Sequence, residues 1–514
     1  MEKEVRVRFA PSPTGGLHIG GVRTALYNYL FAKKNKGKMI LRVEDTDQSR
    51  FVSGAEEYIL EALNWLGINI DEGPVQGGPY TPYRQSERKD RYKEFALKLV
   101  DEGHAYYAFD TPEELDVMRE RLKAARVVSP QYNAITRTTM KNSVTLPEDE
   151  VKKRLESGEP YVIRLKVPRK EEIRLNDLVR GWVMWHSSTI DDKVLMKSDG
   201  MPTYHLANVV DDHLMKITHV IRGEEWLPSA PCHILLYKYL GWESSMPEFA
   251  HLPLLLKPDG NGKLSKRDAE KHGFPVFPMQ WKDPASGELS SGFREDGYLP
   301  EAMLNFLAFL GWNPGTHQEI FSMDELVEAF TIERIGKSGT KFDINKAKWF
   351  NQQYLKAKPD SALSGYLKEE LDKNKISYSE KNVELVCNLL KDRVTFPGDL
   401  WQDGQYFFKA PESYDEQVVN SKWTNEAVQI ITEFKNSVAN KEKIMADEAK
   451  EILTGILEKN NQKIGKVLPA LRLAITGFGS GPDLMMIIEV LGTNEVVARI
   501  GKALAVLSDK VKVS

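Results

Sequence analysis

Two segments far apart in the chain carry the residue types that hold a polyphosphate. The first, residues 8–21, contains four glycines, two prolines and His18. Glycines leave backbone amides open to a bulky anion, and a histidine can donate a hydrogen bond to a phosphate oxygen. The second, residues 257–267, is a glycine-bearing loop whose Lys263 and Lys266 suit it to close over the same charge. Taken singly, the two have ordinary interpretations, a first turn of an α/β domain and an exposed basic turn.

The neighbouring elements predict that the first segment lies at one edge of a parallel sheet. Residues 4–9 alternate β-branched or aromatic residues with charged ones, as a strand does. Residues 22–30 repeat apolar side chains at helical spacing, and Gly37 offers a stop. Residues 39–45 predict a second strand, which ends in the acidic cluster Glu44-Asp45-Thr46-Asp47. Strand, helix and strand in this order indicate a right-handed βαβ unit, whose ligands bind at the carboxyl ends of the strands.

Further strands and helices predict that this sheet is completed later in the chain. Residues 217–221 read as a buried strand that ends at Arg222, and 252–256 as a strand leading into the lysine-bearing loop. In between, 199–208 reads as a turn running into an apolar segment. Residues 274–298 have little periodicity and predict a long loop, peripheral to the fold.

Composition narrows the class of protein. With 514 residues, 41% hydrophobic and 28% charged, the chain fits a globular protein of several structural units. Its net charge of −4 excludes a basic nucleic-acid coat, so a polyanion must meet local basic surfaces. Cys232 and Cys387 lie too far apart in sequence for a disulfide framework and fit a reducing cytoplasm. The sequence contains no run of about 18 apolar residues, so it predicts no membrane span. Four histidines, at 205, 213, 219 and 233, fit no metal-ligand spacing.

The two polyphosphate-suited segments resemble a pair of motifs that occur together in one enzyme class. The order Pro-Ser-Pro-Thr-Gly-Gly-Leu-His-Ile-Gly at 11–20 resembles the HIGH signature of class I aminoacyl-tRNA synthetases, in the form of the glutamyl branch. Gly21 stands where the second histidine of that signature would be. Lys263-Leu264-Ser265-Lys266-Arg267 resembles the KMSKS loop. The resemblance covers essentially the whole chain and is densest up to about residue 350.

The resemblance implies the organisation of the chain. We expect an α/β fold with a Rossmann-type parallel-sheet catalytic domain, split between residues 1–82 and 200–310. An inserted α+β domain at 83–199 would bind the tRNA acceptor end. Residues 311–375 would form a helical stem-contact or linker domain, and 376–514 an all-helical anticodon-binding region. The expected partners are tRNA(Glu) and L-glutamate, without a membrane, and a monomer is the expected state.

The resemblance also implies the roles of individual residues. His18, Lys263 and Lys266 would be catalytic, Lys266 foremost, and Mg²⁺ would accompany ATP. Relatives with a zinc knuckle carry it near residues 106–109, where this chain has no cysteine, so we expect no zinc and no other protein-bound metal. The residues expected to bind ATP are Gly15, Gly16, His18, Gly20, Gly21, Lys263, Ser265, Lys266 and Arg267.

For glutamate, the family resemblance implies a pocket with arginines for the carboxylates, because the guanidinium fork is bidentate. Arg222 would take the side-chain carboxylate, alone or with Arg8, and Glu44 would take the ammonium group. A purely structural salt bridge between Arg8 and Glu44 is the alternative. The full expected set is Arg8, Ala10, Ser12, Glu44, Tyr204, Asn208, Arg222 and Glu225.

Three other functions compete with glutamate–tRNA ligation. Glutaminyl-tRNA synthetases share the catalytic domain but mostly carry β-barrel anticodon domains, which the helical pattern after residue 376 disfavours. A short glutamyl-queuosine-type enzyme lacks the C-terminal units that this chain has. A non-catalytic tRNA-binding scaffold is disfavoured by the presence of His18, Glu44, Arg222 and Lys266 together.

Overall fold

The computed structural model describes residues 4–511, and these fall into two compact units. The first unit holds the chain up to Asp296 together with Pro300–Ala347. The second holds Gly297–Leu299 and the chain from Lys348 onward. The division after Ala347 lies within the stretch 311–375, so helices of that predicted linker domain belong to different units. We describe each unit by itself.

A four-stranded parallel sheet in the order β2-β1-β8-β9 forms the centre of the first unit. Its strands are β1 (Arg6–Phe9), β2 (Lys38–Leu41), β8 (His219–Gly223) and β9 (Glu248–Leu252). The predicted strand at 252–256 is therefore misplaced. Pro253 follows β9 and has no N–H for a ladder, so the chain breaks before the two-residue strand β10 (Leu255–Leu256). That strand pairs with β13 (Thr340–Lys341).

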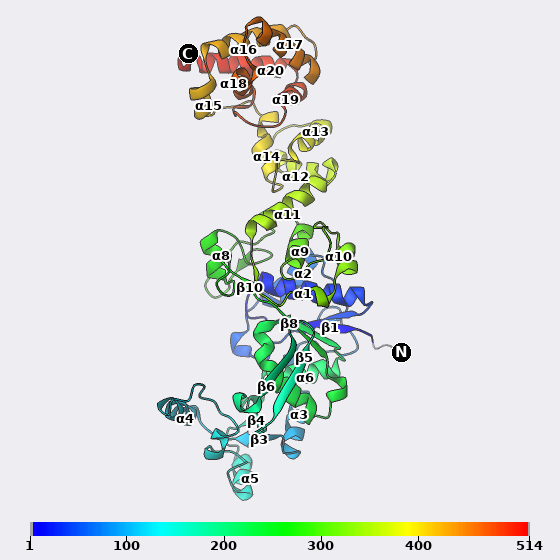
Figure 1. Cartoon of the computed structure of the whole chain (residues 1–514), viewed down its shortest axis with the longest axis vertical. Helices are drawn as coiled ribbons and strands as arrows, with labels where there is room; N and C mark the ends of the chain where they lie inside the picture. The colour runs from blue at the N-terminus through cyan, green and yellow to red at the C-terminus, as the bar shows by residue number, and fades with distance from the viewer. Residues whose placement is uncertain (1–3, 512–514) are drawn as a thin grey trace. The chain divides into compact units, whose positions relative to one another are not determined.

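Helices cover both faces of this sheet. Helix α1 (Ile19–Lys34) packs against β1, β2 and β8, and α9 (Pro300–Ala308) and α10 (Met323–Ala329) pack on α1 (Figure 1). The other face carries α6 (Tyr204–Leu214) and α7 (Ala230–Tyr239), which share a core with Ile40, Val220 and Phe249. Because side chains alternate along a strand, Arg8 and Arg222 emerge on this second face. The stretch from Tyr204, predicted as an apolar segment after a turn, is thus a helix.

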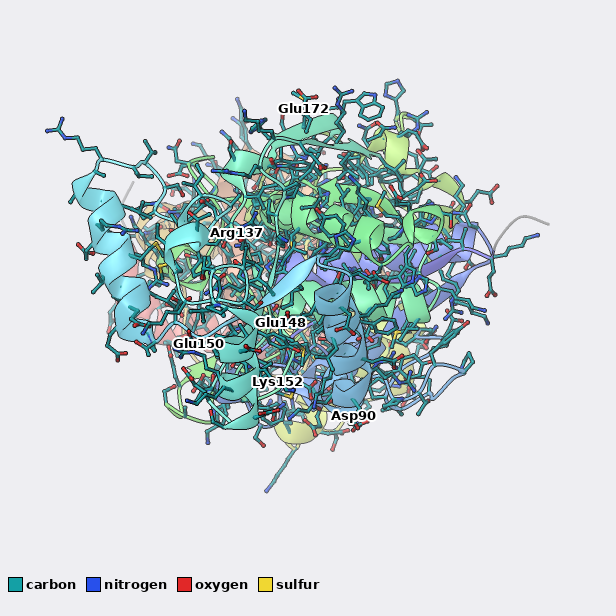
Figure 2. The ribbon with its side chains drawn as sticks, turned by 90° about the horizontal axis from the view of Figure 1, so that it is seen from below. Asp90, Arg137, Glu148, Glu150, Lys152 and Glu172 are labelled. Atoms are coloured by element: carbon teal, nitrogen blue, oxygen red, sulfur yellow. The ribbon has the colours of Figure 1, made fainter. Side chains whose placement is uncertain are left out.

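The chain between α2 (Ala55–Trp65) and α6 folds largely as a second α+β body within the first unit. Helix α3 (Lys89–Asp101) leads into an antiparallel sheet of β3 (Ala105–Ala108), β4 (Val162–Leu165) and β7 (Val194–Met196). Helices α4 (Pro112–Ala124) and α5 (Glu148–Glu156) lie beside this sheet (Figure 1). Figure 2 faces this part, with Glu148, Glu150 and Lys152 labelled on α5.

A hairpin of the same inserted region reaches the central sheet. It consists of β5 (Glu172–Asp177) and β6 (Gly181–His186), which pair antiparallel. The predicted strand at 179–186 includes the turn of this hairpin, and β5 was not predicted because its apolar residues are only Ile173 and Leu175. The strand β5 packs on β9, so the hairpin lies beside the four-stranded parallel sheet.

The prediction of a peripheral loop at 274–298 is wrong in its position. Phe274, Val276, Met279 and Trp281 are buried, and the amide of Ile19 donates to the carbonyl of Val276 at 2.8 Å. The segment has irregular backbone, as predicted, apart from the short pair β11 (Trp281–Lys282) and β12 (Leu289–Ser290). It packs against the turn before α1, where Trp281 and Phe277 occupy the space that a side chain at Gly16 would need.

The second unit is helical throughout the part of the chain that the structure describes, which agrees with the predicted C-terminal region. Its longer helices bury apolar stripes, as α16 does with Ile430, Ile431 and Phe434. No helix within residues 4–511 is long and apolar enough to cross a membrane. The helices are α11 (Ile344–Ala357, which begins in the first unit), α12 (Asp360–Lys373), α13 (Glu380–Leu390), α14 (Asp399–Gly404), α15 (Glu416–Lys422), α16 (Asn425–Val438), α17 (Ala446–Lys459), α18 (Ile464–Thr476), α19 (Leu484–Leu491) and α20 (Thr493–Val506).

Candidate active site

His18 stands at the amino end of α1 and serves as its N-cap. Its Nδ1 accepts a hydrogen bond from the Gly20 amide at 3.1 Å, so the neutral ring carries its proton on Nε2. Within residues 4–511 this buried Nε2 has no hydrogen-bond partner. Burial, reinforced by the charge of Lys263, lowers the pKa of His18 to about 4. The helix start therefore presents a neutral, unpaired N–H donor at a place that favours an anion.

The lysine-bearing loop folds back toward this helix start. Leu256 bridges to Lys263, and the amide of Leu264 donates to the carbonyl of Leu255 at 2.8 Å. Lys263 forms an ion pair with Glu225 at 2.9 Å. Although burial alone raises the pKa of Glu225, the hydrogen bond from Lys263 brings it below its ordinary value. The fold thus brings the two polyphosphate-suited segments to one place, through Lys263.

Ser265 and Lys266, both expected at ATP, have other partners in this structure. Ser265 caps the short helix α8 (Lys266–His272) in a reciprocal capping box with Asp268. Lys266 forms ion pairs with Glu288 of the β11–β12 hairpin at 3.1 Å and with Glu270 of α8 at 3.8 Å. In this structure Lys266 is thus directed toward two carboxylates, and a triphosphate would compete with them for its charge. Arg267 is exposed on the same helix.

Two of the glycines expected at ATP are also required by packing. A Cβ placed on Gly16 would lie 2.8 Å from Cγ of Trp281, and one on Gly21 would lie 2.7 Å from Cδ1 of Leu17. Real Cβ atoms do not approach so closely. Gly15 has a φ of +146°, which disfavours any other residue, and Gly20 donates its amide to His18. The glycines of the first segment therefore serve packing and backbone geometry.

Arg8 and Glu44 belong to one buried network but do not pair with each other. Arg8 Nε donates to Asp212 at 3.2 Å, and Arg42 donates to Asp212 at 2.6 Å and to Glu44 at 2.9 Å. Asn208 donates to the same Glu44 oxygen at 3.0 Å. The alternative of a direct Arg8–Glu44 salt bridge is wrong. Asp212 already compensates the charge of Arg8, and two donors set the orientation of the Glu44 carboxylate.

Arg222 is buried without a carboxylate partner. It donates to the Tyr204 hydroxyl at 2.7 Å, to Nε2 of His251 at 3.0 Å and to the carbonyl of Trp226 at 3.3 Å. These partners are neutral, and among the described residues no acid lies within 4.0 Å of its guanidinium for an ion pair. A buried charge without a counter-charge is costly. Arg222, rather than Arg8, is therefore prepared to receive an anion from outside the chain.

A cavity of about 210 Å³ opens beside these groups. Glu44 lines it, as do Tyr204 and Trp226, two of the three partners of Arg222. Ser12, expected in the glutamate pocket, lines the cavity too. Ala10, also expected there, directly follows β1 and is not among the lining residues. Glu225, expected in that pocket, instead holds Lys263. The remaining lining residues are Pro13, Thr14, Asp45, Thr46, Asp47, Arg50, Phe51, Gln85, Lys197, Pro202 and Thr203.

Sequence reasoning missed Arg42, Asp212 and His251. Arg42 could have been found, because it lies two residues before Glu44 and shares its face at strand period. Asp212 follows Asn208 by four residues, so both lie on one face of α6, but only once that segment is recognised as a helix. His251 had no local signal, since its role depends on the pairing of β8 with β9.

The described residues contain no cluster placed to hold a metal ion. Within 4–511, no group of three or more His, Cys, Asp and Glu side chains is so arranged. His205 and His233 do approach each other, with Nδ1 and Nε2 at 3.4 Å. Cys232 and Cys387 are buried free thiols.

Comparison with known proteins agrees with this architecture. Residues 4–349 match the family model described as tRNA synthetases class I (E and Q), catalytic domain, and residues 352–504 match the model of an anticodon binding domain. A parallel sheet with a histidine-bearing helix start, a lysine-bearing loop and a helical C-terminal part is thus the architecture of a class I aminoacyl-tRNA synthetase.

Whole-chain similarity identifies the branch. The glutamate–tRNA ligase of Cytophaga hutchinsonii is 67% identical over 510 residues, covering 99% of both chains. That of Amoebophilus asiaticus is 61% identical, again over 99% of each. A crystal structure of a glutamate tRNA ligase from Elizabethkingia meningosepticum, in complex with its amino acid, has a TM-score of 0.94 at 50% identity, covering 98% of this chain and all of that one. The chain belongs to the glutamate–tRNA ligase family, as the sequence analysis predicted.

Proposed function

We propose that this chain activates L-glutamate with ATP and transfers it to the 3′-terminal ribose of tRNA(Glu), with the side chains described above in specific roles. The observation that carries the proposal is Arg222, buried beside the cavity without an acidic partner. The side-chain carboxylate of glutamate supplies the missing negative charge, and the guanidinium fork can bind it in bidentate fashion. Glu44, held by Arg42 and Asn208, receives the ammonium group.

ATP lies between the start of α1 and the lysine-bearing loop. His18 donates a hydrogen bond from its Nε2–H to a phosphate oxygen, since this N–H has no other partner within residues 4–511. Lys263, held by Glu225, adds positive charge from the other side. Lys266 joins it after releasing Glu288. Mg²⁺, arriving with ATP, neutralises part of the triphosphate charge when bound.

The reaction then proceeds in two displacements. An oxygen of the glutamate α-carboxylate attacks the α-phosphorus of ATP, and the bond from that phosphorus to pyrophosphate breaks. A ribose hydroxyl of tRNA next attacks the carbonyl carbon of glutamyl-adenylate, the hydroxyl proton is lost, and AMP departs. No side chain becomes covalently attached, so the contribution of the protein is positioning and stabilisation of charge.

The tRNA is bound by the remaining parts of the chain. The helical second unit, which matches an anticodon binding domain, reads unstacked anticodon bases by stacking and edge contacts. The inserted region at 83–199 holds the acceptor end. Its lysines and arginines supply local positive charge that a chain of net charge −4 lacks overall.

ATP–pyrophosphate exchange with glutamate or glutamine, each with and without tRNA(Glu), tests this function. We expect exchange with glutamate and none with glutamine. Exchange supported by glutamine alone would assign the chain to the other amino acid. Absence of exchange in all four reactions, with tRNA binding retained, would identify a non-catalytic scaffold.

A further inference from the structure

Arg222 is held in place by a relay that begins in the inserted hairpin. His251 Nδ1 lies 2.6 Å from Oδ2 of Asp177, and His251 Nε2 lies 3.0 Å from Nε of Arg222. The side chains of Asp177 and His251 are both fully buried. Asp177 is the last residue of β5, whereas His251 and Arg222 lie side by side on β9 and β8. Three strands thus contribute one residue each to a single line of contacts.

The contacts determine which tautomer His251 adopts. Arg222 has only donors, so Nε2 of His251 must accept and its proton must lie on Nδ1. That proton is donated to the Asp177 carboxylate. Burial lowers the pKa of His251 below its ordinary value even though Asp177 opposes this, which keeps the ring neutral. A neutral ring with this tautomer is the one form that accepts from Arg222 while donating to Asp177.

The hairpin turn is itself fastened to the catalytic sheet. Oδ1 of Asp177 accepts the amides of Val179 at 3.0 Å and Arg180 at 2.8 Å, and Asp177 also accepts the His251 amide at 3.2 Å. Arg180 pairs with Glu224, which lies two residues after Arg222. Both carboxylate oxygens of Asp177 therefore accept hydrogen bonds, and these contacts hold the carboxylate in its orientation toward His251.

We propose that Asp177 and His251 are positioning residues for glutamate recognition, which fix the orientation of Arg222 from the inserted hairpin. This rests on the proposed role of Arg222 in binding the substrate carboxylate. A buried guanidinium with only neutral partners has no strong ion pair to orient it. The fixed imidazole holds its Nε, so that one Nη remains directed toward the Tyr204 hydroxyl and the other toward the Trp226 carbonyl. Both of these residues line the cavity.

Asp177→Asn tests the relay because it keeps the shape of the side chain and replaces one acceptor oxygen of the carboxylate by a donor NH₂ group. Whichever way the new amide turns, its NH₂ faces a donor, either His251 Nδ1–H or the amides of the turn. If the NH₂ faces Nδ1 of His251, that nitrogen must accept, so the ring proton moves to Nε2. An Nε2–H then faces the N–H of Arg222 and can no longer accept from it. We expect KM for glutamate to rise about tenfold or more, while KM for ATP changes by no more than about twofold, in aminoacylation at saturating tRNA.

Two substitutions of His251 separate its two contacts. His251→Asn places an amide near the Nδ1 position, so it keeps Asp177 and loses Arg222. His251→Gln places an amide near the Nε2 position, so it keeps an acceptor for Arg222 and loses Asp177. We expect His251→Asn to raise KM for glutamate as Asp177→Asn does, and His251→Gln to raise it much less. This pair decides the matter even if Asp177→Asn fails to fold.

Asp192→Asn is the matched control. Asp192 is also a buried carboxylate of the inserted region, where it accepts from Tyr106 at 2.6 Å and Arg137 at 3.0 Å, away from Arg222 (Arg137 is labelled in Figure 2). We expect it to lower the melting temperature without separating the two KM values. If Asp177→Asn behaves like this control, or if the two His251 variants are equal, the relay is overturned. If Arg222→Ala itself leaves KM for glutamate unchanged, the proposed function fails instead.

Discussion

Lys263 lies close enough to His18 for its charge to act on the imidazole, although 245 positions separate the two residues in the chain. Burial is the larger cause of the low pKa of His18, and Lys263 reinforces it. The fold thus places the Lys263 ammonium near an imidazole that, if protonated, would be repelled by it. Such an arrangement is stabilised when an anion occupies the space between them, and a triphosphate has the required charge.

Removal of Lys266 should slow adenylate formation. Lys266→Ala is expected to lower kcat for ATP–pyrophosphate exchange by about 10²-fold, because it removes charge stabilisation from the transition state. Glu288→Gln is the control, since it removes the shorter of the two ion pairs of Lys266 without deleting the lysine, and should leave kcat within about twofold. An unchanged rate for Lys266→Ala would remove this lysine from the reaction.

Truncation of Arg222 should affect one substrate selectively. Arg222→Ala is expected to raise KM for glutamate far more than KM for ATP, because the buried arginine has no other negative partner within the described chain. Arg222→Lys should recover only part of the loss, since an ammonium group cannot replace the bidentate fork. Steady-state aminoacylation with each substrate varied in turn measures both values. Equal, small changes in the two KM values would contradict the assignment.

His18 should remain neutral across the physiological range and should make stability depend on pH. In the unfolded chain its pKa is 6.5, and in the folded chain about 4, so unfolding takes up a proton between these values. Stability from this residue is present above pH 6.5 and is lost as pH falls toward 4. Between pH 7 and pH 5 the loss is about 2 kcal/mol.

His18→Asn isolates this effect. Asparagine is also a favourable N-cap, so its side-chain oxygen can still accept the Gly20 amide, while the Nε2 donor is gone. Chemical denaturation at pH 7 and pH 5 should show a smaller loss for the variant than for the parent, by about 2 kcal/mol. The variant should also exchange pyrophosphate more slowly. The same pH dependence in both proteins would show that His18 titrates normally.

Asp212 should be essential for stability because it compensates two buried arginines. Asp212→Ala leaves Arg8 and Arg42 without this carboxylate and is expected to cost about 3–5 kcal/mol in free energy of unfolding. Glu120→Gln, which removes an exposed ion pair on α4, should leave the denaturation midpoint unchanged. A small effect of Asp212→Ala would mean that water or Glu44 replaces the missing charge.

The purified protein should contain no structural zinc. The described residues offer no cluster of three or more metal-ligating side chains, and both cysteines are buried and far apart in sequence. Elemental analysis is expected to find zinc far below one equivalent, and chelation should leave the melting temperature unchanged. One tightly bound equivalent would contradict this prediction.

Features that depend on local chain geometry could be predicted from the amino-acid order alone. The alternation at 4–9, the proline- and glycine-rich turn with His18, and the apolar spacing at 22–30 suffice to predict a strand, a turn and a helix. The lysine-bearing loop is equally local. Their family resemblance then identified the fold class, the activity and the residues expected at the site, because motif order and spacing are properties of the chain alone.

Tertiary structure decided which charges pair. Arg8 and Arg222 look alike in sequence, since each ends a strand, yet Asp212 of α6 neutralises Arg8 and only neutral groups contact Arg222. The buried position of 274–298 and the relay from Asp177 to His251 likewise depend on partners far away in the chain. Periodicity reports which face of an element is buried, whereas the partner of a buried charge is chosen by the packing of whole elements.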